Sequence, residues 1–279
     1  MSVTNLYCEG TSQSIDIRVI RALLPRGVVI HPLGGKTSSF VSSIIADRRR
    51  RPNLACLVDH DFDCRDWQIT NQPLRFEYDN RWVGWAWERK EIENYLIDPV
   101  VVRNALGNKA PDRDQYQNAL DEAAKDIATY SAARTALACE NFKNYWGDEV
   151  RKGHLFPPQR GRNYCQVRIA EIVREYRGNR IVSEEDVKEK FRALRPKFRN
   201  GARFENYLHY FAGKDLLYVM RNTLRDFGFE DTSNNYHPEE VFIERVVTRI
   251  EKSTEEVWEW LPEWTVLRRL IEETDFSES

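Results

Sequence analysis

The chain has 279 residues, of which 41% are hydrophobic and 12% aromatic, and this composition excludes an intrinsically disordered protein. A formal net charge of −2 conceals a strong segregation of charge along the sequence. Between Val150 and Arg203 there are 15 basic and 6 acidic residues, whereas from Asp226 to Ser279 there are 5 basic and 15 acidic ones. This asymmetry favours a basic surface for a polyanion and an acidic surface for another partner, with solvated helix faces as the alternative.

Cysteine usage and hydropathy indicate the compartment in which the protein works. The five cysteines are odd in number and include no Cys-X-X-Cys pair, which argues against a disulfide framework or a zinc knuckle. No apolar run is long enough to cross a bilayer, and the first residues do not have the pattern of a signal peptide. We therefore expect a cytoplasmic protein without a membrane partner.

The first sixty residues alternate between strand and helix patterns. Short apolar runs predict strands, and apolar residues at helical spacing predict the helices between them. The strands are expected at 3–8, 28–30 and 54–58, and the helices at 14–24 and 38–51. This β-α-β-α-β order predicts a parallel sheet with right-handed crossovers.

After the third strand the pattern changes. Residues 74–78 and 82–87 predict a hairpin or a pair of edge strands, whose aromatic side chains belong to the core. From Pro99 onward the sequence is almost wholly helical, with helices expected at 113–147, 164–177, 184–195, 203–225 and 239–273. We therefore expect an α/β fold, a parallel sheet flanked by helices, with residues 1–98 as the sheet domain and residues 99–279 as a mainly helical domain.

Three acids follow the third strand in the stretch Asp59-His60-Asp61-Phe62-Asp63. Alternating carboxylates at a strand end repel one another and are partly desolvated, which costs free energy. A divalent cation of the Mg²⁺ type would offset that cost, because it prefers hard oxygen ligands. The alternative is a solvated acidic turn.

The residues that follow the other two predicted strands could also take part in binding or catalysis. Glu9-Gly10 follows the first strand, and Gly34-Gly35-Lys36 follows the second. A glutamate and glycine after one strand, with Asp-X-Asp after the third, resembles the TOPRIM domain. This α/β module binds metal ions in topoisomerases, primases and OLD-family nucleases.

Later motifs narrow the resemblance. The stretches Lys90-Glu91-Ile92-Glu93-Asn94-Tyr95-Leu96 and Gly213-Lys214-Asp215-Leu216-Leu217 resemble those of OLD-like and stand-alone TOPRIM nucleases. Many of these enzymes have an acid where this chain has Gln13, and the nearest acid here is Asp16. The stretch from Glu9 to Asp16 most resembles the TOPRIM effectors of PARIS anti-phage systems, and the length without an attached ATPase domain agrees with that branch.

The resemblance implies an endonuclease that depends on Mg²⁺ or Mn²⁺ and uses two ions. We expect Glu9 and Asp59 to hold one ion and Asp59, Asp61 and Glu93 to hold the second. Asp63 and Glu91 are reserves, since Asp63 suits a turn cap and Glu91 a solvent-facing position. Lys214 would neutralise the reacting phosphate if the segment near 203–225 returns to the active site, with a solvated lysine as the alternative.

The resemblance also implies partners. Nucleic acid, either RNA or DNA with tRNA as one candidate, would be the substrate of an antiviral, toxin-like effector controlled by an ABC-type ATPase. The sequence leaves the oligomeric state open, with a homodimer as one alternative because TOPRIM nucleases often dimerise. The residues expected to contact phosphates are Lys36, Arg195, Lys197, Arg199 and Arg203.

Two other functions compete with this interpretation. A haloacid-dehalogenase-type phosphatase would use Asp59 as its nucleophile, but that family has Thr or Val where this chain has Asp63, and Glu9 would have no role. A non-catalytic interaction module would present the acidic tail and a tryptophan cluster to a partner protein. Its three tryptophans, Trp258, Trp260 and Trp264, could equally be buried in a core.

Overall fold

The computed structural model describes residues 2–34, 38–48, 50–51, 53–60, 62–63, 65–140, 142, 160–176, 181–230 and 236–276. Their contacts divide the chain into two compact units. The first unit comprises Met1–His60, Ile69–Pro111 and Glu240–Ser279, and the second comprises Asp61–Gln68 and Asp112–Glu239. This grouping assigns the C-terminal segment to the unit that contains the sheet, unlike the division at residue 98 expected from composition.

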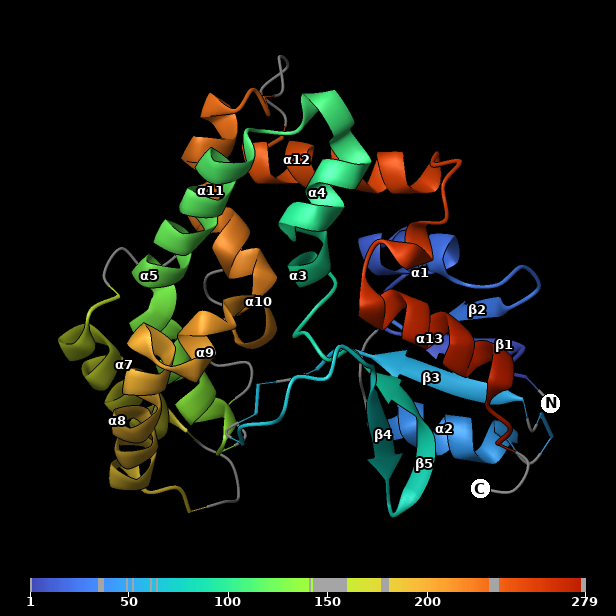
Figure 1. The fold of residues 1–279 in the computed structure, drawn as a ribbon. Helices are drawn as coiled ribbons and strands as arrows, with labels where there is room; N and C mark the ends of the chain where they lie inside the picture. Colours follow the sequence, from blue (N-terminus) through green and yellow to red (C-terminus); the bar gives the residue numbers. More distant parts are fainter. Residues whose placement is uncertain are drawn as a thin grey trace. The chain divides into compact units, whose positions relative to one another are not determined.

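The first unit is built on a five-stranded sheet with the order β2-β1-β3-β5-β4 (Figure 1). Its strands are β1 (Asn5–Cys8), β2 (Val29–Pro32), β3 (Leu54–Val58), β4 (Leu74–Tyr78) and β5 (Arg81–Ala86). The first four strands in spatial order are parallel, and β4 pairs with β5 in an antiparallel hairpin at the edge. The predicted parallel sheet and the predicted hairpin are both confirmed, and the fold is α/β.

Helices cover both faces of this sheet (Figure 1). Helix α2 (Ser38–Arg48) packs on one face, and α1 (Ile15–Leu23) and α13 (Pro262–Glu273) cover the other. Arg268 of α13 donates a hydrogen bond to the carbonyl oxygen of Leu23, at 3.1 Å, which joins the two helices. The remaining helices of this unit are α3 (Glu93–Leu96), α4 (Pro99–Leu106), η1 (Gly107–Lys109), α12 (Pro238–Glu251) and η2 (Val257–Glu259).

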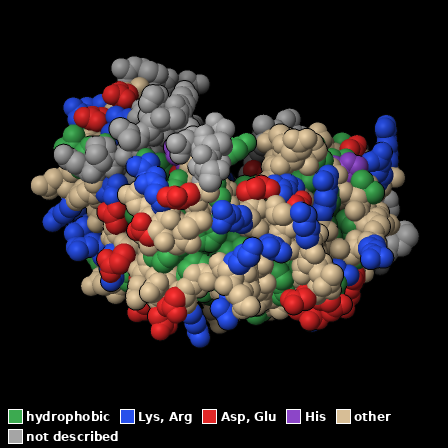
Figure 2. Space-filling model, turned by 90° about the horizontal axis from the view of Figure 1, so that it is seen from above, with side chains coloured by type: hydrophobic (Ala, Val, Ile, Leu, Met, Phe, Trp, Pro, Cys, Tyr) green, Lys and Arg blue, Asp and Glu red, His purple; other side chains and the backbone are tan. Residues whose placement is uncertain are grey.

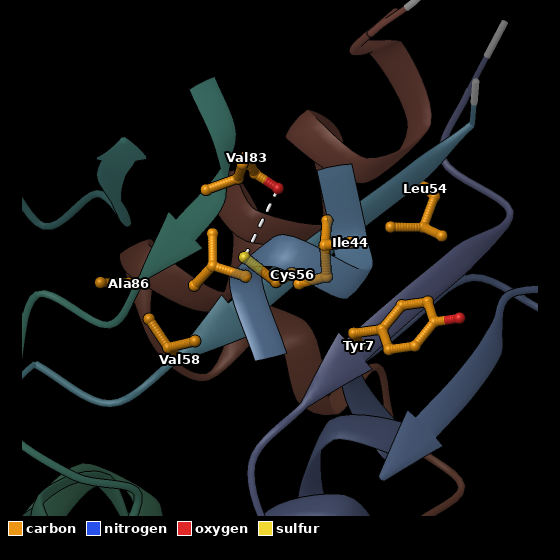
Figure 3. Close-up of a cluster of buried hydrophobic side chains, with 8 residues drawn as sticks. Tyr7, Ile44, Leu54, Cys56, Val58, Val83 and Ala86 are labelled. Atoms are coloured by element: carbon orange, nitrogen blue, oxygen red, sulfur yellow. Dashed lines mark hydrogen bonds between the residues drawn. The ribbon is translucent and has the colours of Figure 1, made fainter. Parts of the chain in front are cut away.

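The core beneath α2 shows why β3 is apolar throughout. Alternate side chains of β3, those of Leu54, Cys56 and Val58, point toward α2 and meet Ile44 there (Figure 3). The Cys56 thiol donates to the carbonyl oxygen of Val83 at 3.4 Å, so it acts as a small buried hydrophobic group with one weak polar contact (Figure 3). Full burial of each large aliphatic side chain stabilises the fold by roughly 1.5–3 kcal/mol.

A glycine permits the close approach of β5 to β3. Gly84 has a φ of +155°, and a Cβ atom there would lie 2.1 Å from the carbonyl oxygen of Cys56. No real Cβ occupies such a position, so only glycine fits between the two strands. The register Cys56↔Gly84 depends on this residue.

The C-terminal segment contributes buried aromatic side chains to the first unit. Trp264 is fully buried and its ring lies 6.0 Å from that of Tyr95, centroid to centroid. The guanidinium of Arg268 covers the ring of Trp258 at 3.7 Å. Trp264 therefore belongs to the core and does not form part of an exposed tryptophan surface.

The second unit is helical. It contains α5 (Arg113–Ala138), α7 (Arg162–Glu175), α8 (Glu184–Asn200), α9 (Ala202–Glu205), α10 (Tyr207–Tyr210) and α11 (Gly213–Asp226). Helix α5 begins at the cap Asp112, which accepts from two backbone N–H groups, and α8 begins at Ser183, which accepts from that of Asp186. No helix in these described ranges, or in those of the first unit, is both long and apolar enough to cross a membrane.

Two predicted helices are interrupted in the structure. The helix expected over 203–225 is three helices, because Asn206 has a non-helical backbone (φ −120°, ψ 42°) and Phe211 and Ala212 are extended. The helix expected over 239–273 ends at Glu251 and resumes at Pro262, whose missing N–H suits a first helical turn. The helix expected over 113–147 is helical as far as Ala138, and residues 143–147 lie outside the described part of the chain.

Candidate functional site

The carboxyl ends of β1 and β3 bring two predicted site residues together. The strands are adjacent and parallel, with Cys8 opposite Leu57, so the residues that follow them emerge at the same edge. The backbone N–H of Asp59 donates to Oε1 of Glu9 at 3.3 Å. Both residues are partly buried, so the Glu9 carboxylate lies against the backbone of Asp59 in a partly desolvated position.

A third acid lies near the same end of β1. Gly10 has a φ of +101°, and a Cβ there would lie 2.3 Å from Oγ of Ser14 and 3.9 Å from Oδ2 of Asp16. Burial raises the pKa of the Cys8 thiol well above its usual value, and the negative charges of Cys56, Asp16 and Glu9 add to the effect. The carboxylates of Asp16 and Glu9 therefore both raise the pKa of the same buried thiol. The turn through Gly10 thus lies beside Asp16, the acid nearest to the position of Gln13.

The segment after β5 continues along the same edge. The Trp87 N–H donates to the carbonyl oxygen of Val58 at 3.0 Å, extending the strand pairing by one residue. His60 Nδ1 forms a hydrogen bond of 3.2 Å with the carbonyl oxygen of Glu88. This contact orients the His60 ring against the backbone that follows β5.

Glu88 is an acid that the sequence analysis missed. Its side chain is fully buried and accepts hydrogen bonds from the N–H and hydroxyl of Thr70, at 2.6 and 3.0 Å, and from the Asn71 N–H at 2.7 Å. The signal for it was a charged residue directly after the apolar run 82–87, where an acid needs partners. Its role is to hold the 70–71 loop against the end of β5.

Glu93 lies in α3, seven residues after the end of β5. It is buried, as are Lys90 and Glu91, so Glu91 does not face solvent as expected. The turn that carries them is fixed by Asn94, whose side-chain oxygen accepts from the Glu91 N–H at 3.2 Å. A buried ion pair between Arg89 and Asp98, at 2.8 Å, flanks the same turn.

Two predicted site residues, Lys36 and Asp61, lie outside the described part of the chain. Asp63 accepts from the Arg65 N–H at 2.9 Å and pairs with the Arg65 guanidinium at 2.8 Å, so it caps a turn as expected. Among the residues that the structure describes, no three His, Cys, Asp or Glu side chains form a group that could hold a metal ion. Glu9 and Asp59 are the pair of predicted ligands joined by a hydrogen bond.

Lys214 lies in the second unit, in the first turn of α11, with an exposed side chain. Its neighbour Asp215 forms a buried ion pair with Arg134 of α5. That pair fixes the start of α11 against α5 and thereby the position from which Lys214 projects.

Arg203 is the most enclosed of the predicted phosphate contacts, with 1% of its side chain exposed. Its guanidinium donates to Oδ1 of Asp66 at 2.8 Å and to the carbonyl oxygens of Asp63 and Arg65 at 3.0 and 2.9 Å. Burial alone would raise the pKa of Asp66, but hydrogen bonds from Lys197 and Arg203 outweigh it and lower that pKa. The Arg203 side chain thus holds Asp63, Arg65 and Asp66 in place. Lys197 pairs with the same acid, Asp66.

The other two predicted phosphate contacts that the structure describes are Arg195 and Arg199, which lie one turn apart on α8. Figure 2 shows one face of the molecule, on which Lys and Arg side chains are interspersed with Asp and Glu side chains. Over the coloured part of this face the cations do not form one continuous patch.

No protein-family model matches the chain, and no curated protein is significantly similar to it.

Proposed function

We propose that the protein is a metal-dependent nuclease of the TOPRIM type that hydrolyses phosphodiester bonds in nucleic acid. The observation that carries the proposal is the contact between Glu9 and Asp59 at the carboxyl edge of a parallel sheet. Ligands of open α/β sheets bind at this edge. A glutamate from one strand and an aspartate from its neighbour supply the hard oxygen ligands that Mg²⁺ prefers.

The chemistry of these residues fits the cation. Mg²⁺ is usually held by one or two carboxylates, with water and substrate phosphates completing its octahedron. Glu9 and Asp59 would hold one ion, and Asp59, Asp61 and Glu93 the second. Bound Mg²⁺ would activate water and stabilise the charge on the attacking and leaving oxygens.

The chain's own groups would orient this site. The Asp59 N–H fixes one oxygen of Glu9, which limits the directions in which the carboxylate can present its remaining lone pairs. Lys214 would offset negative charge on the phosphate. Following the family resemblance, we infer a role as an antiviral effector that cleaves tRNA or another nucleic acid and is controlled by an ABC-type ATPase partner.

The test is cleavage of labelled tRNA, plasmid DNA and single-stranded DNA by the full chain, with and without Mg²⁺. Glu9→Gln and Asp59→Asn should each lower the cleavage rate by about a hundredfold or more. Calorimetric titration with Mg²⁺ and Mn²⁺ should show weaker binding by both variants, which is a readout besides activity.

A matched control is Asp79→Asn. Asp79 lies in the turn between β4 and β5, away from the edge where β5 ends, and has a φ of 52° that asparagine also tolerates. This variant should cleave and bind metal as the parent does. Undiminished cleavage by both Glu9→Gln and Asp59→Asn would sink the proposal.

A further inference from the structure

The second unit contains a cavity of about 380 Å³ that is rich in positive charge. Residues from α5, α8 and the start of α7 line it. Its charged lining consists of five cations and one acid, namely Lys125, Arg160, Arg162, Arg195, Arg199 and Asp126. The volume falls within the range of natural ligand pockets.

Helical spacing delivers these side chains to one place. Arg195 and Arg199 are four residues apart on α8, and Lys125 and Thr129 are four apart on α5, so each pair shares a helix face. Helix α7 begins at Arg162, which also lines the cavity. The three helices pack against one another, so most of the lining is carried by packed helices, and Arg160 and Gly161 directly precede α7.

The charges of the cavity are not balanced internally. Arg160 pairs with Asp126, the acid of the lining, and Lys125 pairs with Glu122 at 2.6 Å. Among the described residues, Arg162, Arg195 and Arg199 form no ion pair. Within the described part of the chain, these three arginines therefore line the cavity without an acidic partner.

The excess of positive charge in the cavity has its clearest effect on Arg195. Its Nε is buried and has no hydrogen-bond partner in the described structure. Burial lowers the pKa of Arg195, and the positive charges of Arg199 and Arg162 lower it further. Like charges held close together with an unsatisfied buried donor cost free energy, and a bound anion would remove that cost.

The start of α7 adds a second source of anion affinity. Its cap residue is Gly161, which has no side chain to accept from the first N–H groups of this 14-residue helix. Among the described residues, no atom lies within 4 Å of the position that a Cβ of Gly161 would occupy. The N–H groups of a helix's first turn and the helix dipole favour an anion there.

We propose that this cavity binds a phosphate group. Guanidinium groups match phosphate oxygens with paired N–H donors, and three of them beside a helix N-terminus form a phosphate-binding arrangement. The phosphate has two sources, a free phosphate compound or a nucleic-acid backbone. An adjoining cavity of about 460 Å³ shares Gly161 and Arg162 and is also lined by Asn163 and Tyr164, leaving room for the rest of a nucleotide.

This inference does not rest on the proposed cleavage at the sheet edge. Binding can be measured on the full chain with a chelator present, so that no divalent cation contributes. The probes are inorganic pyrophosphate, followed by calorimetry, and a short single-stranded oligonucleotide, followed by fluorescence anisotropy. Arg195→Gln and Arg162→Gln should each weaken binding about tenfold, which corresponds to one lost charge-assisted contact.

Arg192→Gln is the matched control, because it removes the same charge from the same helix. Arg192 is exposed, pairs with Glu185 and does not line the cavity. This variant should bind the probes as the parent does, and Glu9→Gln should too even if it abolishes cleavage. Weakening by Arg192→Gln equal to that by Arg195→Gln would mean non-specific attraction and would overturn the proposal.

The two probes also identify the source of the phosphate. Binding of both, weakened by the same two variants, supports a nucleic-acid backbone as the ligand. Binding of pyrophosphate alone supports a free phosphate compound. Absence of measurable binding by either probe at low salt, where attraction between charges is strongest, overturns the proposal.

Discussion

The hydroxyl of Tyr95 donates a hydrogen bond of 2.6 Å to Oε2 of Glu263, joining residues 168 positions apart in sequence. The other carboxylate oxygen of Glu263 accepts from the backbone N–H of Glu88 at 2.7 Å. Glu88 in turn holds Thr70 and Asn71. Helix α13 is thereby connected through buried hydrogen bonds to the segment that leaves the sheet beside the candidate site.

Glu263 should make the stability of the protein depend on pH. Burial raises its pKa to about 7, although hydrogen bonds from Glu88 and Tyr95 oppose the rise, whereas an ordinary glutamate titrates near 4.5. The folded chain therefore holds a proton that the unfolded chain lacks between pH 4.5 and 7. The contribution of Glu263 to the free energy of unfolding is fully present below pH 4.5. It is lost as the pH rises through 7, and the free energy of unfolding then falls by about 3 kcal/mol.

Glu263→Gln should remove this dependence, since glutamine cannot ionise and its side-chain oxygen can still accept a hydrogen bond. The measurement is the free energy of unfolding in denaturant across the interval from pH 4.5 to 7. Glu272→Gln, on the same helix but half exposed, should keep the parent's dependence. An unchanged slope in Glu263→Gln would show that another group is responsible.

Arg203→Lys should destabilise the second unit although the charge is kept. The three acceptors are spread around the planar guanidinium, and the single nitrogen of a lysine ammonium cannot reach Asp66 and the carbonyl oxygens of Asp63 and Arg65 with the same geometry, so part-buried acceptors lose their partner. We expect a loss of about 2–4 kcal/mol in the free energy of unfolding. Lys197→Gln removes an exposed partner of the same Asp66 and should cost less than about 1 kcal/mol. Equal losses would contradict the assignment.

Gly84→Ala should weaken the sheet. The added Cβ would stand 2.1 Å from the carbonyl oxygen of Cys56, and the φ of +155° is one that alanine rarely adopts. The resulting displacement of β5 from β3 should cost about 3 kcal/mol or more, measured by denaturant unfolding. Gly161→Ala, where a Cβ meets no atom of the described residues within 4 Å, should cost less than about 1 kcal/mol. A stable Gly84→Ala protein would argue against the β3–β5 register.

Local sequence patterns predicted the elements that carry local signals. The parallel strands β1, β2 and β3 and the β4–β5 hairpin follow from short apolar runs separated by Gly, Pro and Asp-Asn turns. The start of α8 follows from the cap Ser183. The sequence around Asn206 and Phe211 has no strong helix-breaking signal. The prediction of a single helix there was therefore wrong.

In the candidate site, too, some features could be predicted from the sequence and others could not. The meeting of Glu9 with Asp59 was predictable, because residues after adjacent parallel strands must emerge at one edge of the sheet. The buried role of Glu88 was not, because it depends on a helix 175 residues further along the chain. The burial of Arg203 was hidden as well, since its sequence context differs little from that of exposed arginines nearby.

The amino-acid sequence by itself determined which strands are parallel, where their ends meet, and that carboxylates gather at that edge. These features follow from hydrophobic periodicity and strand direction, which are local properties of the chain. Only the tertiary structure decided which charged side chains are enclosed and which stand open to a ligand. Burial and pairing are set by contacts between distant segments, as Arg203 with Asp66 and the three guanidinium groups at the α5–α7–α8 cavity illustrate.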